Sequence, residues 1–172
     1  MQVSTSRRAF FTGRVNAPEA FVPRPPWSLQ EAEFLGVCTR CGECAKACGA
    51  GVVQTGAGGY PEVSFSLGEC TFCGDCVDAC RPGALNKDRA GKPWSLIARI
   101  GDGCLSAGGV TCRVCGDMCD AGAIRFQPRV GGRADPVVDL DACTGCGACV
   151  RPCPTRVVDV VHVSQSMEEA VS

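Results

Sequence analysis

Sixteen cysteines in a chain of 172 residues are the feature that most limits what this sequence can fold into. They fall into four quartets, and three of the quartets share the spacing C-x2-C-x2-C-x3-C. The third quartet keeps the last two intervals but has seven residues, 105–111, between its first two cysteines. The quartets are Cys38, Cys41, Cys44 and Cys48; Cys70, Cys73, Cys76 and Cys80; Cys104, Cys112, Cys115 and Cys119; and Cys143, Cys146, Cys149 and Cys153.

The remaining composition excludes several classes of protein. Leu, Ile, Val and Phe make up roughly a fifth of the chain, close to the level at which an ordinary aliphatic core cannot form. A net charge of −1 lacks the basic excess that nucleic-acid binding needs. The single histidine, His162, excludes HExxH zinc enzymes and most histidine acid–base chemistry. No apolar run approaches the length of a membrane span. We therefore expect neither an enzyme nor a membrane span.

The cysteines could form lasting disulfides only if the protein were exported to an oxidising compartment. Ser6–Phe11 resembles the head of a twin-arginine export signal, but the chain then continues through Thr12–Glu19 and the prolines 23, 25 and 26, with no apolar segment. We interpret residues 1–33 as a basic, proline-rich N-terminal arm. The expected compartment is the reducing cytoplasm, where disulfides are disfavoured.

The cysteine spacing separates zinc from iron–sulfur chemistry. A structural zinc site combines one C-x-x-C pair with a distant second pair, whereas cysteines at i, i+3 and i+6 suit the separate irons of a cubane. We therefore expect four [4Fe–4S] clusters, with structural zinc as the alternative. The insert 105–111 can loop out while Cys104 still reaches its iron, or Cys104 can bind weakly and leave three stable clusters. Full ligation is the favoured interpretation.

The four quartets are the centres of an internal repeat. The flanks of the quartets are β-prone, and a short helical turn is expected between the third and fourth cysteines. Gly56–Pro61 is predicted to form a hairpin turn. Gly42, Gly74 and Gly147 each follow the second cysteine of a quartet, where a positive φ is expected. The β-prone stretches are 62–65, 94–100 and 136–140 before a quartet, and 52–54, 84–85, 123–126 and 157–163 after one.

Two such units form one bacterial ferredoxin-like domain, so the chain is predicted to be an α+β protein with two tandem, loop-rich, cluster-stabilised domains. The expected domains are 34–92 and 93–163, followed by a tail, 164–172. In this architecture the fourth cysteine of each run ligates the other cluster. The predicted ligand sets are Cys38, Cys41, Cys44 and Cys80; Cys70, Cys73, Cys76 and Cys48; Cys104, Cys112, Cys115 and Cys153; and Cys143, Cys146, Cys149 and Cys119.

Several features inside and outside the quartets resemble the NapF family of ferredoxin-type accessory proteins of the periplasmic nitrate reductase system. The resemblance spans nearly the whole chain and is more specific than the ferredoxin spacing alone. It rests on Ser6–Arg8, Arg24–Ser28, Cys38–Cys41, Gly56–Pro61, Ile100–Asp102, the insert 105–111 and Cys143–Cys149.

The resemblance implies a cytoplasmic protein that contacts the molybdenum-containing catalytic subunit of periplasmic nitrate reductase before export. Members of the family are thought to help that subunit acquire its own [4Fe–4S] cluster, and a redox donor protein is a further expected partner. If clusters are donated, the natural labile site is the one that contains Cys104. The alternative is a general low-potential electron-transfer ferredoxin that serves another redox complex.

Overall fold

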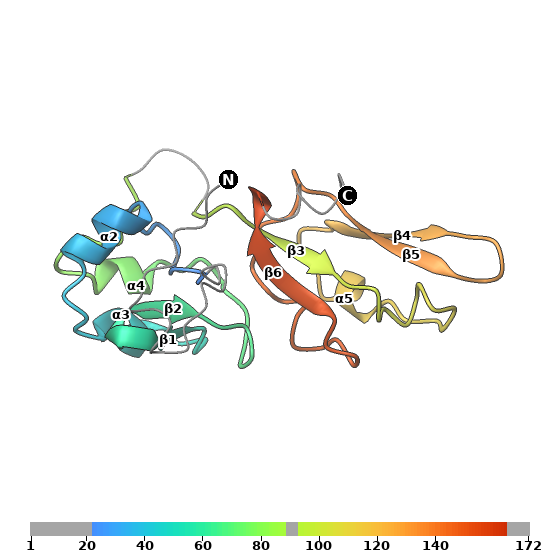
Figure 1. Cartoon of the computed structure of the whole chain (residues 1–172), viewed down its shortest axis with the longest axis horizontal. Helices are drawn as coiled ribbons and strands as arrows, with labels where there is room; N and C mark the ends of the chain where they lie inside the picture. Colours follow the sequence, from blue (N-terminus) through green and yellow to red (C-terminus); the bar gives the residue numbers. More distant parts are fainter. Residues whose placement is uncertain (1–21, 89–92, 165–172) are drawn as a thin grey trace, which may run out of the picture.

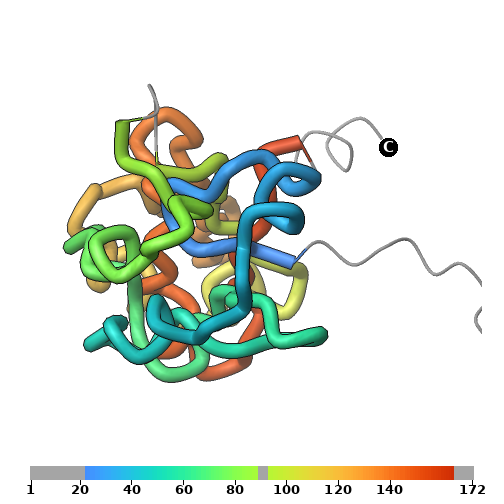
Figure 2. Tube along the Cα trace, turned by 90° about the vertical axis from the view of Figure 1, so that its left-hand side faces the viewer, coloured from blue at the N-terminus to red at the C-terminus, as the bar shows by residue number. Residues whose placement is uncertain are grey.

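The computed structural model describes residues 22–88 and 93–164. The Ser6–Phe11 motif, the rest of the arm before residue 22 and the tail beyond residue 164 lie outside the described residues. Two halves follow one another along the longest axis of the molecule (Figure 1), and the view from one end shows the blue-to-green first half in front of the second (Figure 2). No helix in the described ranges is long and apolar enough to cross a membrane.

The first half contains short helices around one hairpin. Its strands β1 and β2 pair antiparallel with Val53 opposite Val63, and the 3-10 turn between them lies within the hairpin turn predicted at Gly56–Pro61. The elements are α2 (Glu31–Val37), α3 (Glu43–Ala47), β1 (Val53–Thr55), η1 (Ala57–Gly59), β2 (Pro61–Val63) and α4 (Asp75–Asp78).

The second half repeats the plan with longer strands. Its first and last strands, β3 and β6, pair antiparallel, and β4 and β5 form the inner hairpin. In the first half, the pairing of the two ends is reduced to one antiparallel bridge between Ser28 and Leu85. The tandem α+β architecture predicted from the repeat is therefore confirmed. The elements are β3 (Leu96–Ile100), α5 (Val114–Asp117), β4 (Ile124–Pro128), β5 (Ala134–Val138) and β6 (Val158–His162).

Part of the expected N-terminal arm packs onto the first half. Pro25 and Pro26 are fully buried, and the Leu29 backbone N–H donates to Ala84 at 3.0 Å. The Trp27 backbone N–H donates to the Pro93 carbonyl at 2.7 Å. The stretch 23–29 is therefore part of the packed structure, whereas the outer limits of the two domains stay predictions.

Helix α2 was not expected from the sequence, and a single side chain anchors it. Phe34 is fully buried, and the guanidinium of Arg24 lies 5.1 Å from the centre of its ring. The same guanidinium forms a two-pronged ion pair with Glu31, at 2.7 and 3.1 Å. Bidentate pairing and a cation–π contact favour arginine over lysine at this position.

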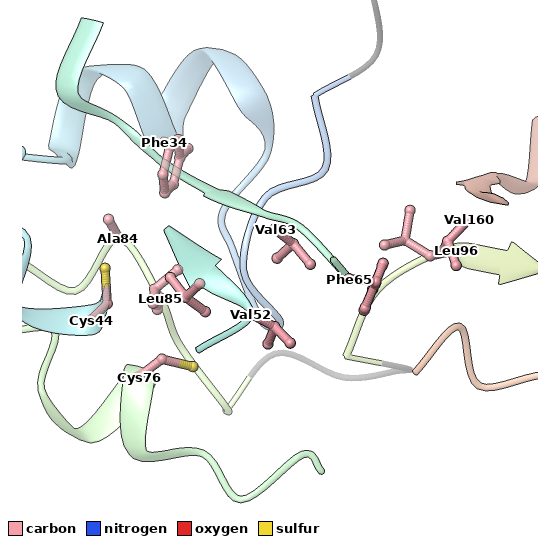
Figure 3. Close-up of a cluster of buried hydrophobic side chains, with 11 residues drawn as sticks. Phe34, Cys44, Val52, Val63, Phe65, Cys76, Ala84, Leu85, Leu96 and Val160 are labelled. Atoms are coloured by element: carbon pink, nitrogen blue, oxygen red, sulfur yellow. The ribbon is translucent and has the colours of Figure 1, made fainter. Parts of the chain in front are cut away.

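The core consists of two clusters of apolar side chains that include cysteines. Cys44 and Cys76 belong to the first cluster, where they lie beside Ala84 and Leu85 (Figure 3). Cys115, Cys143 and Cys149 belong to the second cluster. Side chains that would ligate iron thus occupy core positions, as the low aliphatic content suggested.

Candidate iron–sulfur sites

Three cavities are each lined by four cysteines. The first, called site 1, is lined by Cys38, Cys41 and Cys44 from the start of the first half and by Cys80 from the end of the second quartet. Pro61, Pro82 and Ala84 complete its wall. The cysteine that would be fourth in the first run, Cys48, does not line this cavity. The cavity contains the four cysteines that the crossed assignment predicts as one set.

Site 2 is the reciprocal cavity of the first half. It is lined by Cys48, Cys70, Cys73 and Cys76, with Pro26, Trp27 and Phe72 as apolar neighbours. Each of the two cavities is therefore lined by the last cysteine of the other run. That these cysteines ligate iron in crossed sets stays a prediction.

Site 3 contains the irregular quartet. Cys104, Cys112 and Cys115 line one cavity together with Cys153 from the end of the fourth quartet. Ile100 and Phe126 contribute its apolar wall.

Site 4 is the remaining set, and two of its four cysteines are buried. Cys143 and Cys149 are 8% and 6% exposed, and Cys119 packs against the same apolar cluster. Burial raises the pKa of Cys149 to about 12, and the neighbouring Cys146 and Cys143 act in the same direction. The assignment of Cys119 to this set stays a prediction.

Backbone N–H groups already point at sulfur atoms in the second half. The Ala98 N–H donates to the Cys143 sulfur at 3.4 Å, and the Ala123 N–H donates to the Cys119 sulfur at 3.3 Å. Such bonds stabilise a thiolate and tune the potential of a bound cluster. Within the described residues no group of His, Cys, Asp and Glu side chains converges on a single metal ion.

The three regular quartets share a backbone conformation around their second cysteine that the third quartet lacks. In each regular quartet, the residues just before and just after the second cysteine both have a positive φ. The following glycines have this geometry as predicted, but the preceding residues include two non-glycine side chains that the sequence did not reveal. In the third quartet Arg113 has φ −132° and Thr111 has no positive φ. The positive-φ residues are Arg40, Gly42, Phe72, Gly74, Gly145 and Gly147.

The insert of the third quartet is an ordered loop. The Gly108 N–H donates to the Cys104 carbonyl at 3.0 Å, and the Val110 N–H donates to the Leu105 carbonyl at 2.9 Å. Ser106 is 4% exposed, and its hydroxyl donates to the Ala134 carbonyl at 2.7 Å. The loop therefore closes on itself and is tied to β5, while Cys104 still faces site 3.

Burial sets the protonation of the third cysteine of every quartet. It raises the pKa of Cys44 and Cys115 to about 11, and that of Cys76 and Cys149 to about 12. In the cluster-free chain these thiols keep their protons at neutral pH. Since iron binds thiolates, cluster binding at these positions releases protons.

Two more exposed cysteines shift the other way. Backbone hydrogen bonding from Glu43, helped by the Thr39 hydroxyl, lowers the pKa of Cys41. At Cys153 burial acts to raise the pKa, but hydrogen bonds from Thr155 and nearby backbone N–H groups outweigh it and lower the pKa. These groups already favour the charged form that a ligand requires.

Comparison with known families identifies the cofactor. The model of the 4Fe-4S dicluster domain matches residues 37–85, and a second model of the same description matches residues 110–157. The chain therefore contains two dicluster ferredoxin domains that bind up to four [4Fe–4S] clusters, which confirms iron–sulfur over zinc. The second match begins after Cys104, so it leaves that cysteine untested.

Curated relatives match nearly the entire chain. It is 43% identical over 163 residues to the ferredoxin-type protein NapF of Escherichia coli K12, covering 95% of this chain and 98% of that protein. The NapF protein of Haemophilus influenzae is also 43% identical, over 93% of this chain and 96% of its own length. The H. influenzae ferredoxin-type protein NapG is 33% identical over 80% of this chain and 57% of that protein.

Proposed function

The chain belongs to the NapF family of ferredoxin-type iron–sulfur proteins, and from this we propose that it helps the molybdenum-containing subunit of a periplasmic nitrate reductase acquire its [4Fe–4S] cluster. The similarity over almost the full length of the relatives carries the proposal. The protein acts in the cytoplasm before the client is exported, receives electrons from a redox donor protein and is not itself an enzyme.

The sixteen cysteines serve as the iron ligands in four crossed sets, as grouped in sites 1 to 4. Three cavities, each lined by one predicted set, support this assignment. The cavities also lie against apolar side chains, which limit the access of water to a bound cluster. Burial of this kind is one of the determinants of cluster potential.

Site 3 is the site that transfers a cluster, or part of one, to the client. It combines a seven-residue insert with a loop that lacks the positive-φ residues of the other quartets. Cys104 is held by the turn of residues 101–104 and by the insert, not by the regular run. A ligand on a separate loop can withdraw without disturbing Cys112 and Cys115.

The Cys104→Ala variant tests this function. It is expected to retain about 12 Fe per chain, from three clusters, and to lower the cluster content and activity of the co-expressed client at least tenfold. The matched control is Cys38→Ala, which removes the equivalent first cysteine of a regular quartet and also leaves three clusters. The control is expected to support the client nearly as well as the parent protein.

Equal client activity in the two variants would reject site 3 as the transfer site. Co-purification with the immature subunit provides the separate test of client recognition. Rapid reduction by a general donor, together with no selectivity for that subunit, would instead favour the electron-carrier alternative.

A further inference from the structure

The two halves meet through residues that belong to cluster-binding loops. The backbone N–H of Cys70, in site 2, donates to the carbonyl of Cys146, in site 4, at 2.8 Å. One cysteine comes from the first half and the other from the second, so the loops of sites 2 and 4 are in direct contact.

The Trp94 side chain contacts the same two loops. Its indole N–H donates to the Thr144 carbonyl at 2.8 Å, between the first two cysteines of the last quartet. Its ring meets the Phe72 ring edge-on at 5.4 Å, and Phe72 stands between Cys70 and Cys73. A single side chain therefore contacts a loop of each half.

The fit around this contact is close. A Cβ on Gly147 would overlap the Phe65 ring, and one on Gly145 would overlap the Leu96 carbonyl. Phe65 also contacts Trp94 edge-on at 6.1 Å. Val150 packs against the apolar clusters of both halves. The close approach of Gly145 to Leu96 lies within the second half, whereas the contacts of Phe65 with Gly147 and Trp94 and the packing of Val150 join the two halves beside the cluster loops.

Within each half, the two sites adjoin as well. Cys44 of site 1, on α3, and Cys76 of site 2, on α4, lie in one buried cluster (Figure 3), and the two helices contact each other. Cys115 of site 3 and Cys149 of site 4 likewise belong to one buried cluster in the second half. A shared buried cluster thus links site 1 to site 2 and site 4 to site 3, and the Cys70–Cys146 hydrogen bond links site 2 to site 4.

We propose that the four sites form one continuous electron relay through both halves, with the Cys70–Cys146 contact as its central step and Trp94 as the positioning residue. This inference rests on the ligand sets proposed above. Each step moves one electron: the site that loses it is oxidised, the next site is reduced, and no bond or proton is exchanged. A one-electron donor protein supplies one end, and a one-electron acceptor protein accepts at the other.

Two double variants test the central contact in the full chain. Cys41→Ala with Cys112→Ala removes sites 1 and 3 and keeps the inner sites 2 and 4. Cys73→Ala with Cys146→Ala removes the inner sites and keeps the outer ones. Each is expected to retain about eight Fe per chain. EPR spectra of the fully reduced proteins are expected to show magnetic interaction between clusters in the inner-pair variant and isolated signals in the outer-pair variant.

Isolated signals in an inner-pair variant that holds eight Fe would overturn the relay while leaving the ligand sets intact. Equal interaction in both variants would overturn the relay too.

A double variant that loses more than two clusters counts against the ligand sets. The relay is then tested in chains that keep all sixteen cysteines. There, Trp94→Ala is expected to lose the inter-half interaction, Trp94→Phe to keep most of it, and Tyr60→Ala, in the first half, to leave it unchanged. An unchanged spectrum in Trp94→Ala would reject the positioning role.

Discussion

At the scale of single residues, the crossed ligand sets distinguish cysteines that are neighbours in sequence. Cys44 and Cys48 are four residues apart, yet they line different cavities. In the proposed ligand sets, Cys48 and Cys80 are exchanged between the two runs of the first half, so each run holds one residue that serves the other. Such an exchange would tie the ends of the half together through iron–sulfur bonds.

Paired substitutions measure the exchange by counting iron. Cys41→Ala with Cys80→Ala removes two ligands of one predicted set, so only one cluster is expected to be lost, leaving about 12 Fe per chain. Cys41→Ala with Cys48→Ala removes one ligand from each of two sets, and about eight Fe are expected to remain. The reverse order of iron contents would mean that each run ligates its own cluster.

The residues that escaped sequence analysis did so for physical reasons. Arg40 and Phe72 adopt a positive φ, which is rare for residues other than glycine. No local sequence pattern predicts this conformation. Trp94 was assigned only to a β-prone stretch, because its contacts with Phe72 and Thr144 join segments far apart in the chain. The dicluster character of both halves, in contrast, was predictable because cubane geometry dictates the spacing of the cysteines.

At the scale of elements, the strands follow the sequence closely and one helix does not. The valine-rich stretch 157–163 contains β6, and 94–100 contains β3, because branched side chains suit a buried antiparallel pair. Helix α2 buries only Phe34, so it lacks the repeated apolar face by which a helix is recognised. The pairing of β3 with β6 is not a local property and became visible only in the structure.

Two glycines allow the cost of close packing to be separated from the cost of a positive φ. Gly42→Ala places a methyl group in open space at φ +77°, so it is expected to cost about 1 kcal/mol. Gly145→Ala, at φ +71°, bears the same cost plus roughly 1–3 kcal/mol, because the methyl group would overlap the Leu96 carbonyl.

Thermal loss of the visible cluster absorbance measures the difference. Gly145→Ala is expected to bleach several degrees below Gly42→Ala, since each kcal/mol shifts a midpoint by about 2–8 °C. Equal bleaching temperatures would show that the Leu96 backbone yields to the added methyl group.

At the scale of the whole molecule, the clusters substitute for the aliphatic core. Among residues 22–88 and 93–164, the buried apolar side chains are mostly valine, alanine and cysteine, and each sheet has two strands. An isolated two-stranded sheet is marginally stable at best, and small domains of this kind depend on metal ligation to fold. The free energy of cluster binding is therefore part of the free energy of folding.

Complete removal of iron is expected to unfold most of the chain. The circular dichroism signal of the strands should fall towards that of a coil, and limited proteolysis should become rapid throughout the described ranges. Reconstitution with iron and sulfide should restore both properties. Native-like strand signal and protease resistance in the iron-free protein would show that the apolar clusters suffice alone.

The insert in the third quartet has a consequence for the symmetry of the molecule. The two halves share one plan, and they meet through the second quartet of each half. In the proposed relay, the sites of the first quartets therefore lie at both ends and those of the second quartets at the centre. Such an order is the same when it is followed from either end, so it gives the relay no direction. Because residues 105–111 extend the first quartet of only the second half, the two ends become chemically different. The insert thus makes the two ends of a duplicated molecule different, so a donor protein and an acceptor protein can each recognise one of them.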